Sequence, residues 1–357
     1  MLVPAASGGR IAVAQPQFTL QKSPKRSPSR PNEAVFDAAH GQSNWSQTGF
    51  GSRLMETQFA GIAQLLQRLS VSCRSEDRKP LNLAGPELRL LVVPPPTGTY
   101  DPPNECWRRD PTTLFETDEI RTIIRFLNAG GRLLVFGYRF GDSFTQTNLG
   151  QLINPLGCLL NDDAIVDLHR LQHYYPLECY FETQQDLVPV KWAAAGVDVL
   201  RWRSMATFTI LPGSPIRPLA LSPGGSCISY DRTHRQISFQ SHPVAVAGTH
   251  GAGRFALFGG PHPFETSRLG LLGEASNARF LENVLRWLLT NDSADLDATN
   301  SWAGSAEFDI RDAAQERWRE YGHIESVGNG AEAVAFVENL LRETDTLRAL
   351  SLPKWQA

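Results

Sequence analysis

Cysteines are few in this 357-residue chain, and none of the five forms a C-x-x-C pair. Without such spacing we expect neither a zinc cluster nor a disulfide framework, and reduced thiols in a cytoplasm are the default. The chain also lacks an apolar run close to the roughly 18 residues of a membrane-spanning helix, so no membrane span is expected. The first residues do not combine a basic start with an apolar core, so we expect no signal peptide.

A strong excess of positive charge is missing as well, because the formal net charge is −3. A nucleic-acid partner, which needs a broad basic face, is therefore not expected. His169 and His173 have the i, i+4 spacing of metal ligands, but no H-E-x-x-H motif accompanies them, and no metal site is expected. The glycines of 250–253 fall in an expected hairpin rather than at a helix start, so we expect no cofactor.

Composition divides the chain into four parts. Residues 1–32 form a tail rich in Ser, Pro and basic residues, which we expect to be disordered because it has little apolar surface to bury. Residues 33–290 carry the apolar periodicity of a folded domain. Residues 291–310 are an acidic linker, and residues 311–357 form a helical segment with an apolar stripe. We expect this segment to dock on the domain or to mediate binding of a protein partner or self-association.

Alternating strands and amphipathic helices predict an α/β fold with a doubly wound, mostly parallel sheet. Continuous apolar runs at 88–93 and 133–136 are typical of strands that are buried on both faces. Between them, a helix is expected to begin with Thr117 as its cap, to bury Ile120, Ile123, Ile124 and Leu127, and to end at Gly130. Short β-like pieces from about 160 to 247 predict a mixed or antiparallel extension, followed by a hairpin and a closing helix over 277–289.

The stretch "GRLLVFGYRFGDS", residues 131–143, has the pattern of a nucleophile elbow. A buried strand leads into a G-x-x-x-G turn, whose middle residue in hydrolases and glutamine amidotransferases is the attacking Ser or Cys. Here that residue is Arg139. Arginine stays protonated in proteins and does not attack a carbonyl group. Glutaminase chemistry is therefore excluded, because it needs a cysteine at this position.

The order of four stretches resembles the GIFT domain within the class I glutamine-amidotransferase-like fold. That domain is shared by gliding-motility transporter proteins, a trehalose-utilisation family and an intraflagellar-transport subunit. The similar stretches are "FETDEIRTIIRFLNAGGRLLVFG", "TNLGQLINPLGCLLNDDAIVDL", "HYYPLECYF" and "GTHGAGRFALFGGPHPFETSRL" with the helix that follows. The resemblance covers about residues 34–290 and implies a scaffolding role and carbohydrate binding. "PHPFE" is similar to a His-Pro-Glu partner motif, with one extra residue between His262 and Glu265.

Polar residues follow the expected strands at the edge of the sheet where an open parallel sheet has its ligand crevice. The candidate ligand-binding residues are His40, Gln42, Thr97, Tyr138, Arg139, Asp142, His262 and Glu265. One hypothesis is a non-catalytic domain that works as an interaction, scaffold or ligand-sensing subunit. The alternative is a hydrolase of a sugar, nucleotide or amide that uses His40, His262 and Asp142 around Arg139. These side chains can also simply satisfy loop backbone groups and one another.

Overall fold

The fold is described from a computed structural model in eleven stretches of the chain. They are residues 32–41, 59–85, 87–101, 106–167, 180–203, 205–224, 227–231, 236–238, 240–265, 271–274 and 276–290. Residues 1–31 of the expected N-terminal tail, the acidic linker and the C-terminal helical segment lie outside them, as do Gln42, His169 and His173. Asn32, the last residue of the expected tail, is already part of the first strand.

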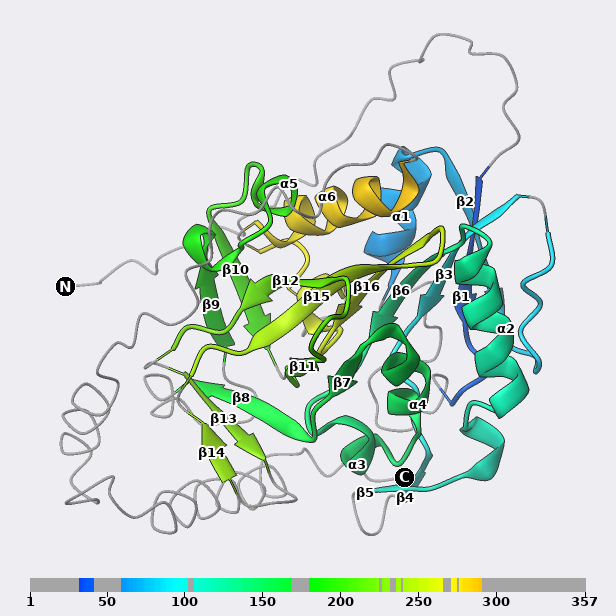
Figure 1. The fold of residues 1–357 in the computed structure, drawn as a ribbon, viewed down its shortest axis with the longest axis horizontal. Helices are drawn as coiled ribbons and strands as arrows, with labels where there is room; N and C mark the ends of the chain where they lie inside the picture. Colours follow the sequence, from blue (N-terminus) through cyan, green and yellow to red (C-terminus); the bar gives the residue numbers. More distant parts are fainter. Residues whose placement is uncertain are drawn as a thin grey trace, which may run out of the picture.

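A seven-stranded sheet forms the centre of the fold, in the order β12-β15-β16-β6-β3-β1-β2 (Figure 1). The strands from β16 to β2 are parallel, whereas β15 is antiparallel to both of its neighbours. The expected α/β class with a mostly parallel sheet is confirmed. The bounds are β1 Asn32–Asp37, β2 Val71–Glu76, β3 Leu88–Val93, β6 Arg132–Phe136, β12 Ile216–Leu221, β15 Pro243–His250 and β16 Gly253–Phe258.

Helices cover both faces of this sheet. Figure 1 shows α1 (Ala60–Arg68) and α6 (Asn277–Leu289) on one side, and α2 (Thr117–Asn128) and α4 (Leu149–Ile153) on the other. Side chains alternate between the two layers along each strand: Leu134 packs with α1 and α6, whereas Leu133 packs with α2 and α4. This two-sided burial is the reason for the continuous apolar runs, because polar residues have no exposed face to occupy.

The start of α2 differs from the sequence-based expectation. Thr117 is the first helical residue rather than the cap; the cap position is Glu116, and its side chain makes no capping hydrogen bond. Ile123 and Leu127 are buried as expected, but Ile120 and Ile124 are only half-buried. The reason is that a buried carboxylate, Glu119, takes a place at the start of the inward face, as described below.

The region from 158 to 238 forms three small antiparallel sheets beside the main one: β10-β9, β11-β7 and β14-β13-β8. The short strands and helices are β4 Thr99–Asp101, β5 Cys106–Arg108, α3 Gly141–Thr145, β7 Cys158–Leu160, β8 Asp163–Asp167, β9 Tyr180–Gln184, α5 Lys191–Ala194, β10 Val199–Arg203, β11 Phe208–Ile210, β13 Cys227–Asp231 and β14 Gln236–Ser238. Strands β12 and β15, by contrast, join the main sheet and extend it in an antiparallel manner.

The two outermost strands of the main sheet are β2 and β12. The sequence analysis missed β2, because its residues VSCRSE are mostly polar and only Val71 among them is buried. Arg74 in the middle of β2 forms ion pairs with Glu33 on β1 and with Glu76. On the opposite edge, β12 contains Pro218 and pairs with β15 through two register shifts.

Candidate functional site

The candidate residues that the structure describes lie at the carboxyl edge of the sheet, in two groups. His40 follows β1, whereas Tyr138 and Arg139 follow β6, and His262 follows β16. Strand β3 lies between β1 and β6. Neighbouring strands are about 4.8 Å apart, so the ends of β1 and β6 are separated by about 10 Å. The hydrogen bonds of each histidine, given below, stay within its own group.

The first group is a buried polar triad of Asp37, His40 and Glu119. The ring of His40 is 0% exposed, and its Nδ1 atom lies 2.7 Å from Oδ2 of Asp37. Its Nε2 atom lies 2.9 Å from Oε2 of Glu119, and its ring stacks on Phe115 with centroids 3.8 Å apart. Both imidazole nitrogens therefore have carboxylate partners, which is the environment of an imidazolium held in place.

The pKa values of His40 and Glu119 are both shifted toward the charged forms. Burial by itself lowers the pKa of His40, but the hydrogen bonds and negative charges of Asp37 and Glu119 outweigh it and raise the pKa above 6.5. Burial raises the pKa of Glu119, but His40, the Leu81 amide and Lys79 together bring it below its ordinary value. An ion pair that is buried and fully hydrogen-bonded in this way holds the β1 loop against α2.

Thr97 ties this loop to the end of β3. Its amide donates to the carbonyl oxygen of His40 at 3.2 Å, and its hydroxyl donates to the carbonyl oxygen of Gly41 at 2.6 Å. Thr97 and His40 are both completely buried. The contacts of these two candidate residues are therefore those of a structural support.

The second group joins Tyr138, His262 and Glu265. Nδ1 of His262 lies 2.8 Å from Oε2 of Glu265, and Nε2 lies 3.4 Å from the Tyr138 hydroxyl oxygen. The Tyr138 and His262 rings meet edge to face, with centroids 5.6 Å apart. The Glu265 carboxylate orients the imidazole, which leaves the other ring nitrogen facing a hydroxyl group. The extra residue of "PHPFE" is accommodated by a short 3-10 turn at 262–264.

The elbow turn itself is present, but its left-handed residue is not Arg139. Phe140 has φ 58° and ψ 22°, and Gly141 after it has φ 48°. Arg139 precedes this turn and is 5% exposed. Its guanidinium carbon lies 5.7 Å from the centroid of Tyr138 and 5.4 Å from that of Phe144. A guanidinium group close to aromatic rings gains cation–π attraction, so Arg139 is packed against Tyr138 of the second group.

Asp142 caps a helix. Its carboxylate accepts hydrogen bonds from the amides of Leu149 and Gly150, both at 2.7 Å, and from the Thr147 hydroxyl at 2.8 Å. These amides belong to the first turn of α4, where amide groups have no acceptor within the helix itself. The contacts of Asp142 are thus with the backbone of α4 rather than with either histidine.

Replacement of Asp142 by alanine is expected to lower the free energy of unfolding by about 1 to 2 kcal/mol, because three donors lose their acceptor. Asp142→Asn keeps one of the two oxygens and should fall between alanine and wild type. Chemical denaturation followed by circular dichroism gives the ordering. Equal stability of the three proteins would contradict the capping role.

Metal ligation finds no support in the described stretches, where no group of three or more His, Cys, Asp or Glu side chains is placed to hold an ion. In the same stretches, no helix is long and apolar enough to cross a membrane. Asp37, Phe115 and Glu119 are site residues that the sequence analysis missed. The i, i+3 spacing of Asp37 and His40 was the one local signal.

Comparison with known proteins supports the fold. No protein-family model and no curated protein matches the sequence. Among solved structures, the mmIFT52 N-terminal domain is similar with a TM-score of 0.54 and 18% identity, over 73% of this chain and 99% of that one. The chain has a GIFT-like fold. The likeness is one of fold, an α/β architecture with a mostly parallel sheet.

Two further structures are similar at lower scores. A putative ThuA-like protein from Bacteroides uniformis has a TM-score of 0.43 and 8% identity, over 76% of this chain and 96% of that one. A cytoplasmic protein from Salmonella typhimurium LT2 also has a TM-score of 0.43, with 15% identity over 72% of this chain and 99% of that one.

Proposed function

We propose that this chain is a non-catalytic, GIFT-like interaction or ligand-sensing subunit of a larger assembly in the cytoplasm. The observation that carries the proposal is Arg139 at the elbow. Its guanidinium group packs against Tyr138 and Phe144 at the turn where enzymes with this elbow carry a nucleophile. Arginine stays charged and supplies only hydrogen-bond donors. The elbow is therefore suited to recognition rather than to covalent chemistry.

The second group provides the polar contacts for a ligand. A tyrosine hydroxyl, an imidazole and a guanidinium lie at the ends of two adjacent strands, β6 and β16. Such a set donates and accepts hydrogen bonds, which is the chemistry that binds a small polar molecule such as a sugar or a carboxylate. Gln42, which lies outside the described residues, completes the proposed set at the neighbouring loop. His40 is left out of the set, because its ring is completely buried and both of its nitrogens contact carboxylates.

The C-terminal segment 311–357 is the proposed assembly element. Its stripe of Val334, Val337 and Leu341 has the spacing of one helix face, and such a face is stable only when it is covered. The intraflagellar-transport relatives that the sequence resembles imply a role as a subunit. A protein partner or a second copy of this chain is the proposed cover.

Deletion of residues 311–357 is the test of the assembly role. We expect the shortened chain to keep its melting temperature within about 2 °C, because every helix and strand that the structure describes lies before residue 291. Its association with a partner, or with itself, should weaken by at least about tenfold, since three buried apolar side chains are removed. Scanning calorimetry and analytical ultracentrifugation measure the two quantities. A large drop in melting temperature would place the segment in the core and remove this support.

A hydrolase remains the second candidate because of one observation, the Glu265–His262–Tyr138 series of contacts at 2.8 and 3.4 Å. An imidazole oriented by a carboxylate can act as a general base. Assays with ester, amide and glycoside substrates should show the same rate for the full chain and for His262→Asn if the protein is non-catalytic. A rate that falls by about a hundredfold in His262→Asn would favour the hydrolase instead.

A further inference from the structure

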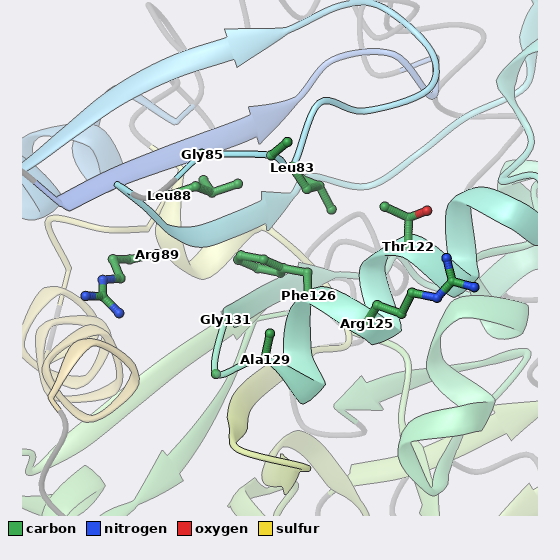
Figure 2. A pocket seen from close by; sticks show the side chains of 11 residues that line it. Leu83, Gly85, Leu88, Arg89, Thr122, Arg125, Phe126, Ala129 and Gly131 are labelled. Atoms are coloured by element: carbon green, nitrogen blue, oxygen red, sulfur yellow. The ribbon is translucent and has the colours of Figure 1, made fainter.

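A pocket of about 460 Å³ opens at the opposite end of the sheet from the second group. It lies where β3 begins and α2 ends, and its lining includes the apolar side chains of Leu83, Leu88 and Phe126. Figure 2 shows Phe126 in the middle, with Arg89 on one side and Arg125 on the other. The pocket thus combines an apolar floor with a positive charge at each end.

Further arginines continue this positive charge along the start of the sheet. Arg89, Arg132 and Arg254 lie near the first residues of three neighbouring strands, β3, β6 and β16, and Arg254 is directly opposite Arg132 in the register. We call these three residues the arginine row. Burial, followed by the charges of Arg254 and Arg89, lowers the pKa of Arg132. Positively charged neighbours that lower the pKa of Arg132 mark a region of positive potential.

Within the described stretches, Arg89, Arg125 and Arg132 form no ion pair with a carboxylate. Arg132 donates instead to carbonyl oxygens, including those of Leu288 at 2.5 Å and Ala252 at 3.2 Å. Arginine that bonds only to neutral carbonyls keeps its full charge available to an anion nearby. The region is therefore suited to bind an acidic segment.

The end of α6 brings such an occupant to this place. Arg132 bonds to Leu288, and Arg254 donates to the carbonyl oxygen of Trp287 at 2.6 Å, so the last turn of α6 is fastened to the arginine row. The residues that follow the helix are 291–297, NDSADLD, with three aspartates around one leucine. An extended chain covers about 3.3 to 3.6 Å per residue, so seven residues reach up to about 25 Å.

We propose that residues 291–297 dock onto the pocket of their own chain. In this arrangement Leu296 packs on the floor formed by Leu88 and Phe126. The aspartates lie against Arg125 and against the arginine row. Exposed ion pairs are individually weak, so a free acidic peptide gains little here. A segment tethered directly at the end of α6 has an effective concentration of about millimolar or more, which favours the chain's own segment over a partner.

Hydrogen–deuterium exchange on the full chain tests the docking. Asp292→Asn, Asp295→Asn and Asp297→Asn together should speed amide exchange at least about threefold in 83–89 and 129–132, because these amides lose their cover. Arg89→Glu with Arg125→Glu should have the same effect. The variant that combines Arg89→Glu and Arg125→Glu with Asp292→Arg and Asp295→Arg should exchange slowly again, because the opposite charges are restored with their signs exchanged. High salt of about 0.5 M should mimic the loss.

Arg121→Glu is the matched control. Arg121 lies on the exposed surface of α2 and pairs with Asp118, away from the pocket lining, so its replacement should leave the exchange pattern unchanged. The aspartate variants lie outside the core, so they keep the test valid if an arginine variant fails to fold. Unchanged exchange in the triple asparagine variant would overturn the proposal. Protection that rises with protein concentration would also overturn it, because the occupant would then be a second copy.

Discussion

Replacement of Glu119 by alanine is expected to lower the free energy of unfolding by about 3 to 5 kcal/mol. Its carboxylate is only 4% exposed and accepts from His40 at 2.9 Å and from the Leu81 amide at 3.2 Å. Alanine leaves His40 buried without its second carboxylate and leaves the Leu81 amide without an acceptor. Both changes destabilise the folded chain, because a buried polar group that loses its hydrogen-bond partner is not compensated by water. Urea denaturation of the purified chain measures the change.

Asp118→Ala is the matched control for this prediction. Asp118 is an acidic residue in the same turn of α2, but its side chain is 88% exposed and pairs with the exposed Arg121. Its replacement should change the stability by no more than about 0.5 kcal/mol. If the two alanine variants were equally stable, the buried triad would not support the fold in the way its geometry indicates.

The same triad gives a pH dependence with a definite sign. The pKa of His40 is raised above 6.5 in the folded chain, so its stabilisation is complete below that pH and declines as the pH rises through the folded value. The pKa of Glu119 is lowered from 4.5, so its stabilisation is present above that pH and declines as the pH falls through the folded value. The stability difference between wild type and Glu119→Gln should therefore be largest between about pH 4.5 and 6.5.

Replacement of Gly259 by alanine is the second large effect, with an expected loss of at least about 3 kcal/mol. Gly259 follows β16, donates to the carbonyl oxygen of Val244 at 2.9 Å and accepts from the Ala206 amide at 3.0 Å. A Cβ atom here would fall within van der Waals distance of the Ala206 carbonyl group. Because the obstacle is hydrogen-bonded backbone, it cannot rotate away as a side chain can. Thermal unfolding should show a clearly lower midpoint.

Gly273→Ala is the corresponding control, because a Cβ atom at Gly273 meets nothing within 4 Å. Its effect should stay within about 0.5 kcal/mol. Gly259 also leads directly into the loop of His262 and Glu265, so ligand binding at the second group should be lost together with stability. A Gly259→Ala chain that melts like wild type would show that the backbone there adapts.

Sequence patterns predicted the elements that are buried on both sides. In these elements the buried positions are occupied by apolar residues, so the pattern is visible in the sequence. They are β3, β6, α6 and the hairpin of β15 and β16. Strand β2 has no such pattern, because its pairing with β1 depends on backbone groups and only Val71 among its side chains is buried. The start of α2 was misjudged because a buried Glu119 looks the same in sequence as an exposed one.

The edge of the sheet at which the candidate residues lie was predictable from the sequence, but their hydrogen-bond partners were not. That polar residues gather at the carboxyl edge follows from the parallel topology alone. The bond between His40 and Glu119 joins residues 79 positions apart, and no local pattern reports it. Asp142 shows the same limit: a loop aspartate near histidines suggests chemistry, whereas its acceptor oxygens are taken up by α4. Whether a carboxylate is available to a ligand or is bonded to the backbone can be read only from the distances in the folded structure.

The margins of the main sheet restrict how copies of this fold can meet. A strand can be added only where an edge presents regularly spaced amide and carbonyl groups, which is also the route to fibrous aggregation. Charged Arg74 and its glutamate partners border one margin, and Pro218, which has no amide hydrogen, interrupts the other. Strand exchange between molecules is thereby discouraged at both margins. Contacts between folded molecules must then be made by side chains on the helical layers and loops, which leaves the backbone ladder of each molecule intact.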